Sequence, residues 1–354
     1  MSRQSKTTLP GQCRAMRIHE TGPIDTGSEP LVLDTIATPR PGEGEVLIKI
    51  EACGVCHTEL DEIEGRTAPP VLPMTPGHQV VGTVVEEGTN CRLGLGGRRV
   101  GVAWIHSACG ECRWCREGRE NLCPDFAATG RDVPGGYADF MTVPESFVHE
   151  IPVGIDSMQA TPLLCAGAVG YRALTLCFLE NGQRLGLTGF GASGHLVLQL
   201  ASHLYPDSPI YVFARSKKER RFALELGAVW AGDTSERPDE LLDAVIDTTP
   251  AWLPVMAAME VLAPGGRLVI NAIRKEAEDR DLLAQLDYER HLWREKTLST
   301  VANVTRHDVR ECLRLAAEIP LKPTVSTFLL EDANKALVEL KHGHVRGAKV
   351  LQIS

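Results

Sequence analysis

Apolar and polar residues follow two different patterns along this chain of 354 residues. Up to about residue 165, short β-branched runs are bounded by Gly and Pro, as in "LVLDTIATPRPGEGEVLIKIEACG" at 31–54 and "GHQVVGTVVEEG" at 77–88. Such runs are typical of strands joined by tight turns. We therefore expect an irregular, mostly β domain in the first part of the chain.

From about residue 166, apolar strands alternate with helical patterns, as in "RLGLTGFGASGHLVLQLASHL" at 184–204 and "PIYVFARSKKERRFALELGA" at 209–228. Strand and helix in this order predict an α/β fold with a doubly wound parallel sheet, covered on both faces. After about residue 300 the pattern is less regular, and we expect this part to return to the first domain. The predicted division is 1–165 with 301–354, and 166–300.

Composition describes an ordinary soluble globular protein, with 43% hydrophobic and 23% charged residues. The formal net charge of −9 argues against nucleic acid or an anionic membrane as a partner. The first twenty residues have charges but no apolar core, and no apolar run approaches eighteen residues. We therefore expect a cytoplasmic protein, in which the eleven cysteines are free to bind metal.

Four of these cysteines, Cys109, Cys112, Cys115 and Cys123, have the spacing C-x2-C-x2-C-x7-C. Zinc takes four thiolates tetrahedrally at about 2.3 Å, so this loop predicts a structural zinc site. Disulfides and an iron–sulfur cluster are the alternatives. Such a site fixes a loop and does not by itself indicate a function. Five further cysteines are expected to pack as small apolar residues: Cys13, Cys53, Cys91, Cys177 and Cys312.

A second set of potential ligands is scattered: Cys56 in "GVCHTE", His78 in "PGHQ" and Cys165 in "LLCAG". Each of them alone is a weak signal, because a single Cys after a strand is more often a small apolar residue. Together they offer two thiolates and one imidazole, a set that leaves a zinc ion with an open fourth position. Their spacing alone does not show that they converge.

A glycine-rich turn, Gly189, Gly191 and Gly194, follows an apolar strand and opens an apolar-periodic helix. In that context G-x-G-x-x-G predicts a dinucleotide site, with the pyrophosphate at the helix N-terminus. A chance glycine loop is the alternative. Where the next strand ends, a carboxylate would favour NAD, but this chain has Arg215, Ser216 and Lys217. These side chains can donate to a 2′-phosphate, so we prefer NADP, with NAD and a solvated basic face as the alternative.

The ordered set "GVCHTE", "PGHQ", the four-cysteine loop, "LLCAG" and the glycine-rich turn resembles the zinc-containing medium-chain alcohol dehydrogenases over nearly the whole chain. The resemblance implies a Rossmann-type domain beside a GroES-like catalytic domain, and two zinc ions per chain. The catalytic zinc would bind Cys56, His78 and Cys165, and the structural zinc the four-cysteine loop. It further implies hydride transfer between a small alcohol or aldehyde and the nicotinamide, and a homodimer or homotetramer.

By the same resemblance, Thr58 stands where the family has the hydroxyl that takes the alcohol proton, although it could instead cap a helix. Three positions depart from the commonest family pattern: Glu59, Gln79 and Asp61. Gln79 removes a negative charge beside the metal, which should leave the zinc more electrophilic. Asp61 replaces a relay histidine and could pass a proton through water, or it could be an ordinary exposed or capping residue.

Other residues carry weaker expectations. His57 could lie near the cofactor phosphates, and Arg346 near the pyrophosphate, although an exposed basic loop is the simpler account. No spacing supports metal binding by His19, His106 or His195, and the aromatic residues Trp104, Phe126 and Trp293 are expected in the core by default. The complete cysteine sets disfavour a zinc-free quinone reductase and favour simple or aromatic alcohols over polyols. A non-catalytic, cofactor-binding member of the fold is the remaining rival.

Overall fold

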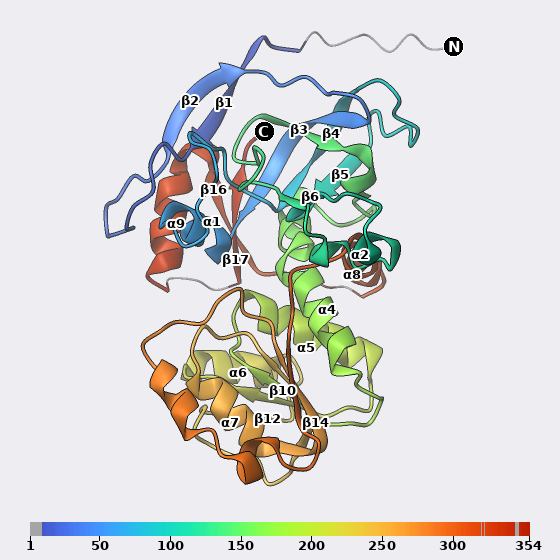
Figure 1. Ribbon diagram of the computed structural model, residues 1–354. Coiled ribbons are helices and arrows are strands. Elements are labelled where there is room, and N and C mark those ends of the chain that lie inside the picture. Colours follow the sequence, from blue (N-terminus) through green and yellow to red (C-terminus); the bar gives the residue numbers. More distant parts are fainter. Residues whose placement is uncertain (1–8, 320, 322, 344–346) are drawn as a thin grey trace.

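The computed structural model describes residues 9–319, 321, 323–343 and 347–354. These residues form an upper and a lower body in Figure 1, each built around one large β-sheet. The upper body contains both described ends of the chain, and the helix α4 (Ala166–Cys177) runs from it into the lower body.

The sheet of the upper body has seven strands among the described residues, and its centre is the long strand β3. The apolar residues Val46, Ile48 and Ile50 of β3 are fully buried, so the sheet closes over its own core. β3 pairs antiparallel with β4, β8 and β17, while β16 and β17 are parallel. The strands are β3 (Glu45–Val55), β4 (Val80–Glu87), β5 (Arg99–Val102), β8 (Phe140–Pro144), β9 (Val148–Glu150), β16 (Val325–Leu329) and β17 (Ala348–Gln352).

Smaller elements surround this sheet. Two short antiparallel pairs are β1 (Gln12–Arg17) with β2 (Val32–Ala37), and β6 (Ile105–Ser107) with β7 (Ala127–Ala128). The helical segments here are α1 (His57–Ile63), α2 (Arg113–Arg116), η1 (Glu120–Leu122), η2 (Glu145–Phe147), η6 (Leu330–Asp332) and α9 (Ala333–Lys341).

The sheet of the lower body has six parallel strands among the described residues, in the order β12-β11-β10-β13-β14-β15. All four residues of β10 are buried, which is typical of a parallel sheet covered on both faces. The strands are β10 (Leu185–Thr188), β11 (Ile210–Phe213), β12 (Trp230–Gly232), β13 (Leu242–Asp247), β14 (Leu262–Ile270) and β15 (Thr297–Thr300).

Alternate residues of β13 show how the two faces are covered. Ala244 and Ile246 belong to the apolar cluster that includes α4 and α5, whereas Val245 packs in a separate cluster with α7. Successive side chains of a strand point to opposite faces, so both faces are closed by helices. These helical segments are α5 (Ala192–Leu204), α6 (Lys217–Glu225), α7 (Leu253–Val261), η4 (Arg280–Gln285) and η5 (Tyr288–Leu292).

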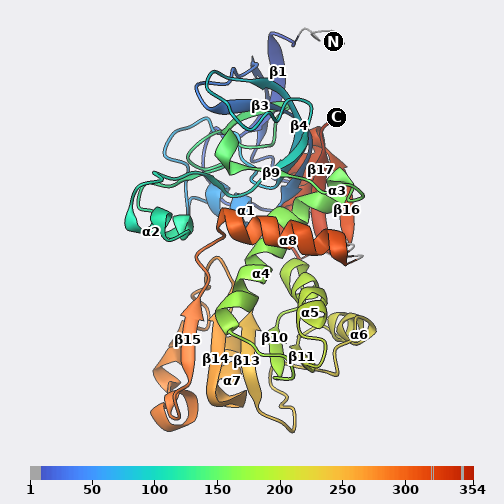
Figure 2. The ribbon, with the colours of Figure 1, turned by 90° about the vertical axis from the view of Figure 1, so that its right-hand side faces the viewer.

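A layer of helices lies between the two sheets (Figure 2). It consists of α3 (Ser157–Ala160), η3 (Thr161–Leu164), α4 and α8 (Arg306–Glu318). One apolar cluster runs through this layer, from Val81 of β4 to Leu187 of β10. The ion pair between Arg172 of α4 and Asp308 of α8 has a separation of 2.8 Å. The two bodies therefore share a continuous core.

The end of the chain is more regular than we expected. The segment at 299–319, which we expected to be less regular, contains the thirteen-residue helix α8. Thr305 caps α8 by accepting a hydrogen bond from Asp308 N, and the Asp308 carboxylate accepts one from Thr305 N. β17 then returns to the upper body and pairs with β3, with Leu351 opposite Cys53.

The predicted fold class is confirmed: a doubly wound parallel sheet stands beside a mostly β body. The strand order of the six-stranded sheet is that of a Rossmann fold. We retain 166–300 as the proposed dinucleotide-binding domain, with 1–165 and 301–354 as the other. Among the described residues, one helical stretch, Ser157–Cys177, is long and apolar enough to cross a membrane, and 61% of its most apolar 18-residue window is buried inside the protein. It is therefore read as a core segment.

Candidate active site and metal centres

The three scattered ligands come together between the two bodies. Cys56 follows β3 and caps the N-terminus of α1, His78 precedes β4, and Cys165 lies between η3 and α4. Their ligand atoms all lie within 4.8 Å of one another, and His78 Nε2 is 3.4 Å from Cys165 Sγ. Their spacing in the sequence gave no indication of this convergence.

Glu59 fixes two of the three ligands at once. Its Oε1 accepts a hydrogen bond from His78 Nδ1 at 2.6 Å, and its Oε2 accepts one from Cys56 N at 2.7 Å. Because Nδ1 is bound to this carboxylate, Nε2 is the nitrogen left to face the two sulfurs. Glu59 is 0% exposed, so the contact is shielded from water. The role of Glu59 was not among the predictions, although its place at the third position of α1 is that of a capping box.

The protonation of the cluster favours a cation. A hydrogen bond from Cys165 holds the pKa of Cys56 well below its usual value of 9.0, and the neighbouring His78 adds to this effect. The same hydrogen bond, with burial, raises the pKa of Cys165. Burial lowers the pKa of His78, but Glu59 and Cys56 more than offset it and raise this pKa well above 6.5.

These residues fit a zinc ion. Two thiolates and an imidazole are ligands that zinc prefers, and a site with three protein ligands leaves a coordination position for substrate or water. The lowered pKa of Cys56 leaves a thiolate in the cluster, and the Glu59 carboxylate orients His78 from behind, as ligating histidines usually require.

The remaining residues predicted around this centre lie on or next to α1. Thr58 is buried, and its Oγ1 is 3.7 Å from Cys56 Sγ, while Cys56 itself is the N-cap. Gln79 is buried against Gly54, whose hypothetical Cβ would meet its Oε1 at 2.5 Å. Asp61 is 1% exposed, so its interpretation as an exposed residue is wrong. The relay by Asp61 stays a prediction, and His57 is exposed.

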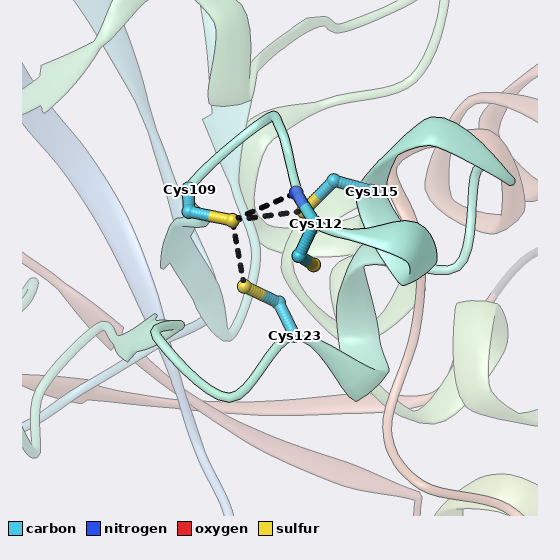
Figure 3. A group of neighbouring side chains, drawn as sticks. All are labelled: Cys109, Cys112, Cys115 and Cys123. Atoms are coloured by element: carbon cyan, nitrogen blue, oxygen red, sulfur yellow. Dashed lines mark hydrogen bonds between the residues drawn. The ribbon is translucent and has the colours of Figure 1, made fainter.

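The four cysteines of the loop form a second cluster (Figure 3), with all four sulfurs within 4.8 Å of one another. Cys109 Sγ lies 3.5 Å from Cys123 Sγ and 3.9 Å from Cys115 Sγ, and none of these thiols forms a disulfide. Cys112 N donates to Cys109 Sγ at 3.3 Å, which lowers the pKa of Cys109 to about 7. Desolvation raises the pKa of Cys115 to about 12, so without metal Cys109 is the thiol that ionises most readily. The convergence of all four sulfurs is the observation that fits zinc.

The glycine-rich turn connects β10 and α5 as predicted. Gly189 has φ +81°, and an added Cβ would lie 2.7 Å from Thr248 Oγ1; at Gly194 it would lie 2.6 Å from the carbonyl oxygen of Gly189. Side chains are therefore excluded at both positions. At Gly191 an added Cβ would meet nothing within 4 Å, which leaves the backbone open to a phosphate at the N-terminus of α5.

The turn contacts the chain next to Cys165. Ser193 Oγ donates to the carbonyl oxygen of Ala166 at 3.3 Å, and Ala166 is the residue after Cys165. One hydrogen bond therefore joins the proposed dinucleotide site to the residue that follows a proposed zinc ligand.

The residues predicted to select the cofactor stand where β11 ends. Arg215, Ser216 and Lys217 are exposed, and Ser216 caps α6 by accepting a hydrogen bond from Lys218 N at 3.2 Å. The side chains of Arg215 and Lys217 are therefore free to extend toward solvent at the carboxyl edge of the sheet, where a dinucleotide binds.

The remaining candidate residues lie in different parts of the molecule and differ in burial. The rings of Trp104 and Phe126 are partly buried and lie 5.2 Å apart in a tilted arrangement. Trp293 is 53% exposed, so the expectation that it lies in the core is wrong, and it contacts Tyr288 in the lower body. His106 and His195 are buried, and His19 is exposed beside Asp34. Four of the five remaining cysteines are buried, as expected for packing, and Cys91 is partly exposed. Arg346 lies outside the described residues.

The fold and the site define a class: an oxidoreductase with a Rossmann-type sheet, a metal centre next to its glycine turn and a second, structural cysteine cluster. Residues 42–153 match the family model of the alcohol dehydrogenase GroES-like domain, and 229–351 match that of the zinc-binding dehydrogenases.

Comparisons of the whole chain with known proteins indicate the same class of protein. The chain is 41% identical to the probable alcohol dehydrogenase AdhA of Mycobacterium tuberculosis, over 96% of this chain and 97% of that protein. It is 32% identical to an alcohol dehydrogenase of Geobacillus stearothermophilus, over 91% and 96%. The cobalt- and zinc-bound thermostable alcohol dehydrogenase from Pyrobaculum aerophilum superimposes with a TM-score of 0.85 at 25% identity, over 96% and 99%. This chain belongs to the zinc-containing medium-chain alcohol dehydrogenase family, which confirms the predicted resemblance.

Proposed function

We propose that this protein is a zinc-dependent alcohol dehydrogenase that interconverts a small alcohol with its aldehyde or ketone, using a nicotinamide dinucleotide. The hydrogen bond between Ser193 and Ala166 carries this proposal, because it joins the glycine turn to the residue after Cys165. Hydride transfer requires the cofactor and the polarised oxygen at one place, and this contact brings their proposed sites together.

Cys56, His78 and Cys165 would hold the catalytic zinc, and the four-cysteine loop the structural one. When bound, the catalytic zinc is a Lewis acid that polarises the alcohol or carbonyl oxygen, and the nicotinamide supplies the redox chemistry. Glu59 keeps the imidazole of His78 turned toward the two sulfurs. Thr58 would take the proton of the alcohol, and its burial next to Cys56 supports this role.

We propose NADP as the preferred cofactor, with NAD possible. The exposed Arg215 and Lys217 supply positive charge at the end of β11, and the chain has Ala214, not a carboxylate, just before them. A carboxylate there would repel a 2′-phosphate, whereas an arginine can bind it with two hydrogen bonds.

The expected assembly is a homodimer or homotetramer, in the cytoplasm. β15 is the last strand of its sheet, and its four residues are all exposed, so its outer edge offers unpaired backbone groups to a second copy.

We propose simple or aromatic alcohols and aldehydes as substrates, because the two cysteine sets are complete.

Metal analysis joined to an aldehyde and alcohol screen tests the proposal. We expect two zinc ions per chain. At saturating aldehyde, the change in absorbance should show that NADPH is oxidised faster than NADH. Arg215→Asp should reverse the ratio of kcat/KM between the two cofactors. Two zinc ions without turnover on a broad panel would instead identify a non-catalytic member of the family, and an unchanged cofactor ratio would exclude Arg215 as the selecting residue.

A further inference from the structure

An ion pair connects the two bodies next to the catalytic centre. Arg274, four residues beyond the end of β14, donates from Nε to Asp61 Oδ1 of α1 at 2.8 Å. Within 9–319, 321, 323–343 and 347–354, this is the ion pair that links the segment 178–300 with the rest of the chain. Arg66 donates to the same oxygen at 2.6 Å, but from the same body as Asp61.

The residue after Arg274 holds the same segment onto the six-stranded sheet. Lys275 forms an ion pair with Asp247 at the carboxyl end of β13, and its Nζ also donates to the carbonyl oxygens of Thr249 and Ala251, at 2.8 and 3.0 Å. Asp247 is 0% exposed, so this anchor is buried. Further along the segment, Asp279 accepts hydrogen bonds from the backbone of Trp252 and Leu253, both at 2.8 Å.

The start of the segment contacts the cofactor turn. Asn271 Nδ2 donates to Ser193 Oγ at 3.1 Å, and Ser193 in turn donates to Ala166 beside Cys165. The segment 271–279 is therefore fixed to the sheet by Lys275 and Asp279, and touches the glycine turn through Asn271. Among the residues that the structure describes, the side-chain hydrogen bond of this segment to the upper body is the one that Arg274 donates to Asp61.

At the other end of the ion pair, Asp61 lies on the helix α1, which also holds residues of the proposed catalytic centre. α1 spans His57–Ile63, with Cys56 as its N-cap and Thr58 in its first turn. Asp61 is 1% exposed and lies one turn further along this short helix. A shift of Asp61 relative to the lower body would therefore move Cys56 and Thr58 as well. Figure 1 shows α1 on the side of the upper body that faces the lower one.

We propose that Arg274 and Asp61 are positioning residues, whose ion pair sets the placement of α1, with Cys56 and Thr58, relative to the dinucleotide-binding sheet. On this account Asp61 acts by holding Arg274, and no proton passes through it. The inference rests on the proposed dehydrogenase function, since the geometry it sets is that of hydride transfer. Misplacing reacting groups by about 1 Å can cost about 100-fold in rate, so one ion pair across this junction can matter far more to turnover than to stability.

The test compares Arg274→Gln with Arg66→Gln in the zinc-loaded protein. Both variants remove one arginine from the same oxygen of Asp61, but only the first removes the link between the bodies. We expect Arg274→Gln to lower kcat/KM for the alcohol by about 10- to 100-fold at saturating NADP. The Kd for NADPH, from its fluorescence, and the zinc content should stay at parental values, and Arg274→Lys should restore part of the activity. Arg66→Gln should lose much less.

Asp61→Asn separates positioning from proton relay. Positioning predicts that Asp61→Asn and Arg274→Gln give similar losses, that the double variant loses no more than either one, and that the pH–rate profile keeps its shape in all three. Losses that multiply in the double variant, a profile changed by Asp61→Asn alone, or parental kcat/KM in Arg274→Gln would each overturn the proposal.

A measurement without turnover keeps the inference separate from the proposed function. Amide hydrogen exchange at 271–275 should be faster in Arg274→Gln than in the parent and in Arg66→Gln, with NADPH bound. A parent protein that shows no turnover would refute the proposed function alone, and the exchange would still test the ion pair. Equal exchange in the three proteins would refute the link.

Discussion

The two sulfur clusters of this protein are built in opposite ways. The four ligands at 109–123 lie within one loop, whereas Cys56, His78 and Cys165 are spread over more than a hundred positions and three elements. In the loop, the spacing of the cysteines by itself brings the sulfurs close. In the other cluster, Cys56 and His78 meet only when β3 pairs with β4, and Cys165 joins them from the layer of helices.

Their surroundings differ as much as their spacing. Cys109 is exposed and its sulfur is surrounded mainly by the other cysteines of the loop, whereas His78 is 1% exposed and bound to the buried Glu59. We infer that a metal ion orders the loop, while the fold prepares the scattered site before a metal arrives. Loss of metal should therefore affect stability at the first cluster and chemistry at the second.

Replacement of a scattered ligand should give the largest effect on turnover. Cys56→Ser removes one thiolate from the buried site, and Lewis-acid stabilisation is worth several kcal/mol, so kcat/KM should fall by about 1,000-fold or more. The melting temperature should change little, because the framework around Cys56 does not depend on the ion. Steady-state rates, zinc per chain and thermal unfolding measure the three quantities on one preparation.

Cys109→Ser is the matched control, since it also removes one thiolate from one site. It should lower the zinc content by a similar amount, but its effect should appear in the melting temperature. Release of a closed loop of about 15 residues costs about 3 kcal/mol, which corresponds to a fall of about 4 °C for a chain of this length. A Cys109→Ser protein that keeps its melting temperature and loses turnover would contradict the assignment of the two roles.

The same contrast explains what the sequence could predict. The four-cysteine loop, the glycine turn and the alternation of strands and helices are local patterns, and local geometry decides them. The structure brings the sulfurs of 109–123 together, and places Gly189 and Gly194 where a side chain would clash. Convergence of Cys56, His78 and Cys165 was expected only because the ordered motifs resemble a family.

Long-range partners could not be predicted in this way. Arg274 is an ordinary basic residue in the sequence, and its contact with Asp61 spans 213 positions. No pattern within either segment indicates that contact. For such residues tertiary packing decides, and the sequence does not. The helix α8 is a different case, because its apolar residues Val309, Cys312 and Leu313 recur at helical spacing after a capping box, so the expectation of a less regular segment overlooked a local signal.

Glu59→Gln should have a smaller effect than loss of a ligand. The amide keeps the size of the carboxylate but loses the charge that orients His78 and Cys56, and such partners typically contribute about 10- to 100-fold in metal affinity or activity. Competition for zinc with a chelator measures the affinity. The matched control is Glu62→Gln, one turn further along α1, because Glu62 is equally buried but its carboxylate has no hydrogen-bond partner among the described residues. Equal losses in both variants would show that burial, rather than the contact with His78, matters.

The smallest predicted effect is on the free energy of unfolding, and it follows from a contrast between two buried histidines. Burial, with Arg310 and Arg306 nearby, lowers the pKa of His149 from 6.5 to about 3, whereas Glu59 helps to raise that of His78. In the unfolded chain His149 takes a proton below pH 6.5, but in the folded protein it stays neutral down to about pH 3. Its contribution to stability is therefore complete above pH 6.5 and is lost as the pH falls toward 3. Between pH 7 and pH 5 this one group should cost the parent about 2 kcal/mol of unfolding free energy, and His149→Gln should lose correspondingly less. Urea unfolding of both proteins at the two pH values measures the difference, which is independent of any constant loss from the substitution itself. An identical decrease in both proteins would mean that the folded protein protonates His149 as readily as the unfolded chain does.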